Sequence, residues 1–168
     1  MNTLHGVDIP GPVYIYGASN PHNLSLAKEQ YDVAGWVDDQ RTGLYYGLPV
    51  IPRDRLCPEA RVINCVCRTT EEREAVWHKI RSRNCEHLSL VSPRADVSPY
   101  ARLAPGLYIQ EGVVIQAGAD ICHNVTAHSG AMIGERVFVG EHSFVGPGTI
   151  ICGRSRIEPC VYVGAGAI

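Results

Sequence analysis

The 168-residue sequence predicts a protein of two parts, a small α/β domain followed by a parallel β-helix. From Val91 onward, every sixth residue is aliphatic. That period fits neither a helix nor a simple hairpin sheet and is typical of hexapeptide coils, in which short strands stack into three flat walls. Before Val91, apolar runs of strand length alternate with helical segments, which favours a sheet of mainly parallel strands. We therefore place the domains at residues 1–90 and 91–168.

The first 90 residues contain the signals of a βαβ arrangement. Residues 13–16, 31–37, 61–66 and 87–90 read as strands, and 47–52 reads as a short extended segment between prolines. Residues 69–84 fit a helix, because Thr69 and Glu72 form a capping-box pattern and basic residues gather near its end. Residues 1–11 form a polar lead-in.

Two short stretches in this domain are candidates for binding a phosphorylated ligand. The turn Gly17, Ala18, Ser19, Asn20, Pro21 and His22 follows the first strand, with Asn20 as a helix cap and Pro21 in the first helical turn. A strand, a glycine turn and a helix N-terminus often bind phosphate, although a plain connecting turn has the same pattern. Asp38 and Asp39 follow the second strand, where acidic side chains can bind a ribose or base or simply lie in solvent.

The hexad repeat supplies the inward residues of the predicted β-helix. Its thirteen aliphatic positions are Val91, Val97, Leu103, Ile109, Ile115, Ile121, Ala127, Ile133, Val139, Val145, Ile151, Ile157 and Val163. Three residues after each aliphatic, most hexads carry a residue that tolerates positive φ, namely Gly106, Gly112, Gly118, Asn124, Gly130, Gly148 and Gly166. Three hexads make one coil, and each coil should lie about 4.8 Å above the last.

Composition narrows the classes of function. A formal net charge of −2 gives no electrostatic basis for binding nucleic acid or a membrane surface. We find neither a long apolar run nor a signal-peptide pattern, and the seven scattered cysteines are best explained as thiols in a reducing cytoplasm.

Several motifs resemble the bacterial sugar acetyltransferases that modify sialic acid or the UDP-4-amino-sugar precursor of bacillosamine. The resemblance covers nearly the whole chain. It rests on the glycine turn at 17–22, on Gly35-Trp36-Val37-Asp38-Asp39, on Gly47-Leu48-Pro49-Val50, and on the coils at 109–118 and 147–148.

This resemblance implies a Rossmann-like, nucleotide-sugar-binding N-terminal domain and a left-handed β-helix that assembles as a homotrimer. It also implies acetyl transfer from acetyl-CoA to a sugar amine or hydroxyl, with histidine as general base. Gly17, Ala18, Ser19, Asn20, His22, Asp38 and Asp39 would then bind the nucleotide-sugar substrate, and Phe144, Gly146 and Gly164 would bind the cofactor.

The match departs from the family pattern at the base. The family places its base in a V-x-H-[DE]-C hexad, and Glu135 occupies that histidine position here. A glutamate, with an ordinary pKa of about 4.3, is poorly matched to amine deprotonation near neutrality. His128 occupies a position where the family has an asparagine near the sugar, so we expect His128 to be the relocated base, with Glu135 orienting it and His142 as a further catalytic candidate. The alternative is that His123, His128 and His142 are surface residues.

The second departure concerns the last hexad. Family members carry further coils that contact CoA, whereas this sequence ends on a hexad at 163–168. An uncovered coil presents unpaired backbone groups, so we expect either a truncated product or a second chain that covers this edge.

Two other functions compete with acetyl transfer. One is a non-catalytic scaffold that keeps the nucleotide-sugar pocket but has lost the base. The other is a metal enzyme like the gamma-class carbonic anhydrases, because His123 and His128 have the spacing of two zinc ligands and Gln116 stands near the place of a third. The leading interpretation assigns no metal ligand.

Overall fold

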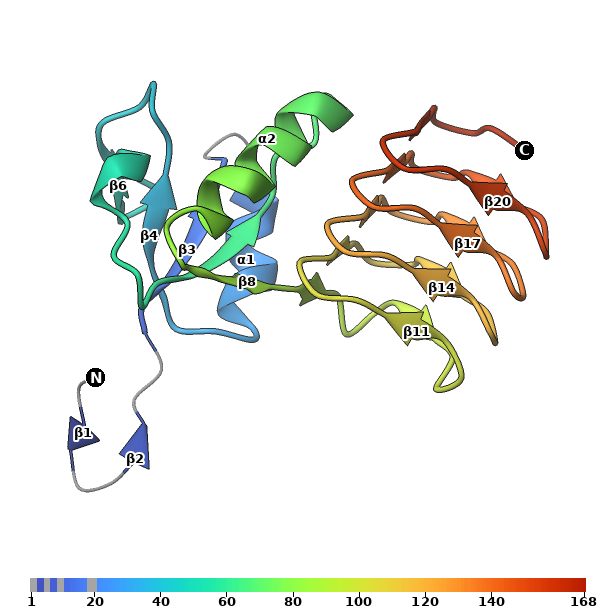
Figure 1. Ribbon diagram of the computed structural model, residues 1–168, viewed down its shortest axis with the longest axis horizontal. Coiled ribbons are helices and arrows are strands. Elements are labelled where there is room, and N and C mark those ends of the chain that lie inside the picture. The colour runs from blue at the N-terminus through green and yellow to red at the C-terminus, as the bar shows by residue number, and fades with distance from the viewer. Residues whose placement is uncertain (1–2, 5–6, 9–10, 18–20) are drawn as a thin grey trace.

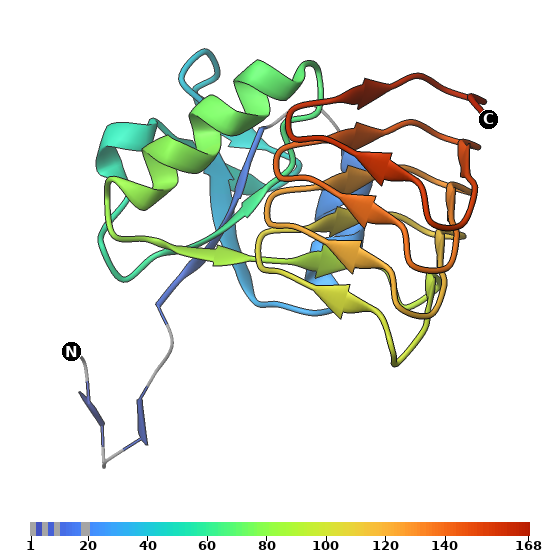
Figure 2. The ribbon, with the colours of Figure 1, turned by 45° about the vertical axis from the view of Figure 1, so that its right-hand side comes forward.

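The computed structural model describes residues 3–4, 7–8, 11–17 and 21–168. A mixed α/β part lies beside a stack of triangular coils in both views of the ribbon (Figures 1 and 2). The α/β part comes first in the chain, and the hexad coils follow. The α/β sheet ends with Leu88, and the first strand of the coils begins at Leu90.

The α/β part contains one six-stranded sheet in the order β5-β6-β4-β3-β7-β8. The strands are β3 (Val13–Tyr16), β4 (Val33–Val37), β5 (Gly43–Tyr45), β6 (Leu48–Ile51), β7 (Arg61–Asn64) and β8 (Glu86–Leu88). All neighbouring pairs are parallel except β5 and β6. Strands β4 and β7 pair with opposite edges of β3, so the strand order reverses there and leaves a crevice at the carboxyl ends of β3 and β7.

Two helices cover opposite faces of this sheet. Helix α1 (Pro21–Lys28) buries Leu24 in the same cluster as Ile15, whereas α2 (Thr70–Arg81) buries Val76 in the cluster that contains Tyr16. The two faces of β3 are both apolar, as expected for a strand in the middle of a parallel sheet.

Several boundaries differ from the sequence-based expectation. Strand β4 begins two residues later than expected, and the 87–90 segment divides between β8 and β9. Sequence reasoning missed β5, the 3-10 turn η1 (Arg53–Arg55), and the short antiparallel pair β1 (Thr3–Leu4) and β2 (Val7–Asp8). These segments are short, and their pairing depends on neighbours that periodicity does not reveal.

The start of α2 forms half of the expected capping box. Thr69 is the N-cap, and its Oγ1 accepts a hydrogen bond from the Glu72 amide at 3.2 Å. The Glu72 carboxylate bonds the Arg68 guanidinium instead of returning to the cap residue. The helix therefore starts where the sequence indicates, but the acidic partner is used for an ion pair.

The coils contain thirteen two-residue strands, and the second residue of each is one of the predicted aliphatic positions. The strands are β9 (Leu90–Val91), β10 (Asp96–Val97), β11 (Arg102–Leu103), β12 (Tyr108–Ile109), β13 (Val114–Ile115), β14 (Asp120–Ile121), β15 (Thr126–Ala127), β16 (Met132–Ile133), β17 (Phe138–Val139), β18 (Phe144–Val145), β19 (Ile150–Ile151), β20 (Arg156–Ile157) and β21 (Tyr162–Val163).

The strands stack into three parallel walls with the predicted register of three hexads per coil. The walls are β9-β12-β15-β18-β21, β10-β13-β16-β19 and β11-β14-β17-β20. Ile109 pairs with Ala127, and Ala127 with Val145, so a given position recurs in each successive coil. These sheets are consistent with the left-handed β-helix implied by the family resemblance.

The aliphatic ladder points inward, as predicted. Ile121 and Ile133 are fully buried, while Leu103 near the first coil is 39% exposed. Each coil hides its aliphatic side chain only under its neighbours, so the middle of the stack is best packed. All seven predicted turn-formers adopt positive φ. Sequence reasoning missed four further residues in the same left-handed turn position: Arg136, His142, Arg154 and Cys160.

A buried arginine joins the two parts of the molecule. Arg73 on α2 is fully buried, and its Nε donates to the carbonyl oxygen of Asn124 at 2.6 Å while Nη2 donates to that of Gly106 at 3.2 Å. Nη1 donates to the carbonyl oxygens of Asn64 and Val66 at 2.8 and 2.9 Å. One guanidinium thus ties α2 to the end of β7 and to two successive coils.

All seven cysteines are free thiols. Within the described ranges, no helix has the length and apolarity needed to cross a bilayer.

Candidate functional site

A pocket of about 470 Å³ lies at the carboxyl ends of β3, β4 and β7. Gly17, Asp38 and Asp39 line it together, so three of the predicted substrate-binding residues converge. This is the position where parallel α/β sheets bind ligands, and its size falls in the usual range of about 300–1,000 Å³.

Gly17 allows the chain to turn closely against β7. Its φ is +100°, and an added Cβ would lie 3.1 Å from Cγ2 of Val66. A larger residue would therefore be strained and would crowd the pocket wall. The neighbouring candidates Ala18, Ser19 and Asn20 lie outside the described residues.

Both predicted aspartates also organise the loops around the pocket. Oδ1 of Asp38 accepts hydrogen bonds from the amides of Gln40 and Arg41 at 2.8 and 3.1 Å, which fixes the turn after β4. Asp39 accepts from the Arg53 amide at 3.1 Å and pairs with its guanidinium at 3.3 Å. The carboxylates are thus held in place at the mouth of the pocket.

The pocket also contains cationic residues that sequence reasoning missed. Arg68 and Lys79 line it, with Glu72 between them on the same wall. Arg68 is 80% exposed and paired with Glu72. Cations at the carboxyl ends of parallel strands suit phosphate groups, and only the fold brings these side chains to Gly17.

His22 lies away from the residues that line this pocket. Its Nε2 is 3.0 Å from Oε2 of Glu111, so the start of α1 contacts the first complete coil. Oγ of Ser129 donates to Oε1 of Glu111 at 3.2 Å, and Tyr108 bonds Asn23 in the same region. His22 thus contacts the coils, and it is not among the described residues that line the pocket with Asp38 and Asp39.

His128 lies on the wall that faces α1. Its ring centroid is 4.7 Å from that of Phe144 and 6.0 Å from that of Tyr108. Burial, and then the positive charge of Arg73, lower the pKa of His128, so the imidazole is neutral near pH 7. Nε2 is buried and has no hydrogen-bond partner among the residues that the structure describes.

The candidate cofactor residues form a continuous feature with His128. Gly146 and Gly164 follow His128 at intervals of 18 residues, so they occupy the same position in the next two coils. A Cβ on Gly146 would lie 2.7 Å from the Ala165 nitrogen, so stacking of the coils already requires glycine there. Gly164 has open space around it.

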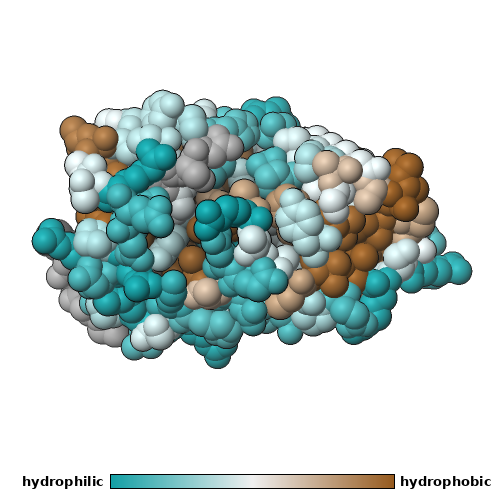
Figure 3. All heavy atoms as spheres, turned by 90° about the horizontal axis from the view of Figure 1, so that it is seen from above, coloured by the Kyte–Doolittle hydropathy of each residue, from teal (hydrophilic) through white to brown (hydrophobic). Residues whose placement is uncertain are grey.

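Phe144 begins a strip of aromatic side chains above His128. Its ring is buried and stacks on that of Tyr162 at a centroid distance of 4.4 Å, and Tyr162 is 56% exposed. Seen from above, hydrophobic residues gather over the β-helix end of the molecule, while the α/β side is mostly hydrophilic on this face (Figure 3). Phe144, Tyr162 and the two glycines therefore lie on the same wall of the coils as His128.

Glu135 and His128 lie on different walls of the same chain. Glu135 follows β16, faces a shallow pocket lined also by Ser98 and Gln116, and lies 3.7 Å from the Arg154 guanidinium. His128 follows β15 and contacts Phe144. The described contacts of one chain do not join the two candidates.

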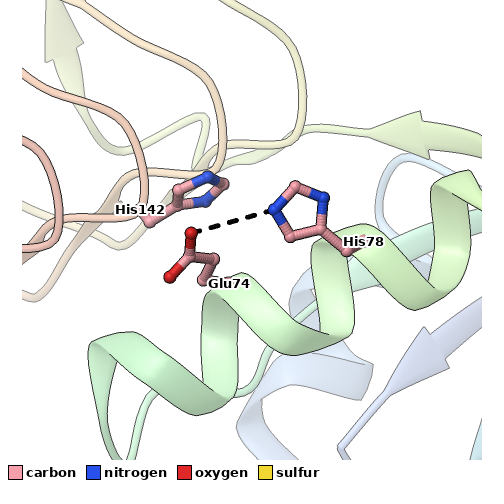
Figure 4. Close-up of side chains that lie close together, drawn as sticks. All are labelled: Glu74, His78 and His142. Carbon is pink, nitrogen blue, oxygen red and sulfur yellow. Dashed lines mark ion pairs between the residues drawn. The ribbon is translucent and has the colours of Figure 1, made fainter.

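His142 is buried between the coils and α2, which excludes the surface-residue alternative for this histidine. Its Nδ1 is 2.8 Å from Nδ2 of Asn124. Burial lowers the pKa of His142, as does the nearby His123. The ring points toward Glu74 and His78 of α2 (Figure 4).

Within one chain, the described residues do not bring together the three candidates of the carbonic-anhydrase-like hypothesis. His123 stacks on Trp77 at a centroid distance of 4.9 Å, whereas His128 lies against Phe144 and Gln116 lines a pocket on another wall. Among the described residues, the group that could hold a metal contains none of these three.

Solved structures with the same fold include acetyltransferases. The acetyltransferase domain of PglB from Neisseria gonorrhoeae, in complex with acetyl coenzyme A, is 22% identical over 94% of this chain and 89% of its own, with a TM-score of 0.77. PerB from Caulobacter crescentus, in complex with CoA and GDP-perosamine, is 24% identical over 93% and 87%, with a TM-score of 0.77. WeeI from Acinetobacter baumannii is 18% identical over 94% and 79%, with a TM-score of 0.85.

No family model and no curated protein sequence matches the chain. The likeness is therefore one of fold, and it includes the α/β part as well as the coils because more than nine-tenths of the chain is covered. The expected resemblance is confirmed at that level: the chain shares the architecture of hexapeptide-repeat sugar acetyltransferases.

Proposed function

We propose that this protein is an acetyl-CoA-dependent acetyltransferase that acts on an amino or hydroxyl group of a nucleotide-linked sugar, in the cytoplasmic stage of surface-glycan synthesis. Two observations carry the proposal: Gly17, Asp38 and Asp39 line one pocket of the α/β part, and His128, Gly146 and Gly164 share one wall of the coils. Solved neighbours with this fold bind acetyl coenzyme A, or CoA together with GDP-perosamine.

The Rossmann-like α/β domain holds the nucleotide sugar in this proposal. Asp38 and Asp39 would accept hydrogen bonds from the ribose or base, and Arg68 and Lys79 would pair with phosphate oxygens. Gly17 and the turn after it would bring backbone amides to the phosphates.

His128 is proposed as the general base. The sugar amine or hydroxyl attacks the thioester carbonyl carbon, and neutral Nε2 of His128 accepts the proton that the nucleophile loses. The tetrahedral intermediate then collapses, the carbon–sulfur bond breaks, and the CoA thiolate leaves and takes up a proton. The CoA chain would lie along Phe144, Gly146 and Gly164.

A homotrimer would reconcile the positions of Glu135 and His128. These residues lie on different walls of one chain, so a neighbouring copy is needed to bring the Glu135 wall against the His128 wall. The exposed aromatic ring of Tyr162 supports burial of coil surface in such an assembly.

The second candidate function is a non-catalytic nucleotide-sugar-binding scaffold. One observation favours it, namely that Nε2 of His128 is buried, so that a substrate must displace a neighbouring group to reach it. The family base position holds Glu135, which carries an ordinary exposed carboxylate.

Calorimetric titration with acetyl-CoA and with GDP- and UDP-linked amino sugars distinguishes these functions. The acetyltransferase binds both ligands, and His128→Ala lowers turnover by about 10²–10⁴-fold while both affinities stay within a few-fold. Sugar-nucleotide binding without CoA binding would establish the scaffold, and unchanged turnover in His128→Ala would remove His128 from the mechanism.

A further inference from the structure

A second cluster of reactive side chains lies along the seam between α2 and the coils. Gly106, Asn124, His142 and Cys160 occupy one corner of four successive coils, 18 residues apart, and all four have positive φ. Glycine is the least strained residue in this conformation. The chain nevertheless places asparagine, histidine and cysteine side chains one above another on the corner that α2 covers.

Helix α2 presents a carboxylate and an imidazole to this corner. Glu74 and His78 are four residues apart and therefore lie on one face of the helix. Oε1 of Glu74 is 3.8 Å from Nε2 of His78, and a ring nitrogen of His142 completes a group in which all three ligand atoms lie within 4.8 Å of one another. Figure 4 shows the three side chains converging from the helix and the coil.

A thiol lies next to the same carboxylate. Sγ of Cys160 is 3.7 Å from Oε2 of Glu74, on the coil above His142. Two imidazoles, a carboxylate and a thiol are the ligand types that zinc binds in proteins.

We propose that Glu74, His78 and His142 bind a divalent transition metal of the zinc class, with the Cys160 thiolate as fourth ligand. Zinc bonds of about 2.0–2.3 Å place neighbouring tetrahedral ligand atoms about 3.3–3.7 Å apart. The Glu74–His78 and Glu74–Cys160 separations of 3.8 and 3.7 Å are already near this spacing. Small rotations of these side chains would bring the remaining ligand atoms to the same spacing, because His78 is 61% and Glu74 40% exposed.

The environment of His142 sets a condition on metal binding. Nδ1 contacts the Asn124 side chain at 2.8 Å, which leaves Nε2 to bind the metal. A metal on Nε2 requires the hydrogen on Nδ1, so Asn124 must turn its amide oxygen to the ring. It then gives up two bonds, the one it donates to the Arg73 carbonyl at 3.2 Å and the one it accepts from Nδ2 of Asn64 at 3.0 Å. Metal binding is thereby coupled to the polar contacts that join α2 to the coils.

This site is separate from the proposed catalytic groups. It contains neither the residues that line the sugar-nucleotide pocket nor His128. A metal bound here would cross-link α2 to two coils and hold the α/β domain at a fixed position relative to the coil wall. The inference does not depend on the proposed function.

The test uses the full chain, free of affinity tag, stripped with chelator and titrated with Zn²⁺ by calorimetry. We expect one Zn²⁺ per chain, a higher melting temperature with Zn²⁺, and a loss of affinity of at least about tenfold in Glu74→Gln and in His78→Ala. Glu59→Gln, an exposed carboxylate elsewhere, is the matched control and should bind like the parent protein.

Cobalt substitution tests the ligands themselves. Co²⁺ should give the visible absorption of a tetrahedral site with a sulfur-to-metal band, and Cys160→Ser should remove that band while Cys152→Ser, also exposed, keeps it. Circular dichroism of each metal-free variant checks that the fold is intact. Equal Zn²⁺ affinity in the parent, Glu74→Gln and His78→Ala would overturn the proposal, as would Zn²⁺ that leaves the melting temperature unchanged.

Discussion

Arg73 shows how a single side chain can join the α/β part of the chain to the coils. It is fully buried without a carboxylate partner, and burial lowers its pKa to about 10, so it remains charged at neutral pH. The charge is stabilised by four carbonyl oxygens from β7, its following loop and two coils. The guanidinium fixes the relative positions of these segments, because an apolar residue in its place would leave the four carbonyl oxygens unpaired.

We therefore expect Arg73→Met to lower the free energy of unfolding by about 3 kcal/mol or more, since each unpaired buried acceptor costs about 1–3 kcal/mol. Urea denaturation followed by circular dichroism measures this change. Lys79→Met on the same helix is the control and should unfold near the parent midpoint. A parent-like midpoint for Arg73→Met would show that the guanidinium does not hold the seam.

We expect the buried, stacked imidazole of His87 to make the stability of the fold sensitive to acid. Its ring stacks on Trp77 at a centroid distance of 3.5 Å, and burial, followed by the charges of His123 and Arg81, lowers its pKa to about 4. The unfolded chain, with an ordinary histidine pKa of 6.5, binds the proton first. The stabilising contribution is thus complete above about pH 6.5 and is lost as the pH falls toward 4.

His87→Phe keeps the stacked ring but cannot be protonated. We expect its unfolding free energy to fall less steeply than that of the parent protein between pH 6.5 and 5, measured by urea titration at each pH. Parallel pH profiles for the two proteins would contradict the assignment of this acid sensitivity to His87.

At the scale of elements, the hexad turn can be tested with two glycines that differ mainly in backbone conformation. The φ of Gly148 is +65°, in the left-handed region, whereas the φ of Gly164 lies outside that region. A Cβ added to either glycine would have no atom within 4 Å. Gly148→Ala should therefore destabilise the coil by about 1–2 kcal/mol, whereas Gly164→Ala should be neutral or slightly stabilising. Thermal denaturation of both variants measures the difference, and equal melting temperatures would show that the positive φ of Gly148 does not favour glycine there.

The same elements show what the sequence can and cannot predict. The ladder from Val91 to Val163 was predictable because each coil repeats one local environment, and a period of six is typical of stacked hexapeptide coils. Strand β5 was not predictable because it is only three residues long, and the contacts of α2 were not because they join segments that are distant in the sequence. Arg73 lies 51 residues from the Asn124 carbonyl that it bonds, and no periodicity connects them.

The residues of the candidate site also differ in whether the sequence alone could predict their positions. Gly17, Asp38 and Asp39 could be assigned to one pocket because carboxyl ends of parallel strands meet at one sheet edge. The contact of His22 with Glu111 could not be predicted from the sequence, since it depends on how α1 packs against the coils. The cationic residues Arg68 and Lys79 carry no local motif, so only the folded chain identifies them as pocket residues.

For the whole molecule, the proposed mechanism requires assembly. We expect light scattering after size-exclusion chromatography to give three times the chain mass, because Glu135 and His128 lie on different walls. Tyr162→Glu, at an exposed coil position, should shift this assembly toward monomer. A monomeric protein with full activity would show that one chain contains the complete site.

The central claim is that this fold joins a sugar-nucleotide pocket to an acyl-transfer surface. The most direct measurement is mass spectrometry of GDP- and UDP-linked amino and hydroxy sugars incubated with acetyl-CoA and the protein, with released CoA thiol quantified in parallel. The proposal predicts an acetylated sugar nucleotide and one equivalent of thiol, both greatly reduced in His128→Ala. If the protein binds a sugar nucleotide in the pocket but neither product appears with any acceptor, acetyl transfer is contradicted.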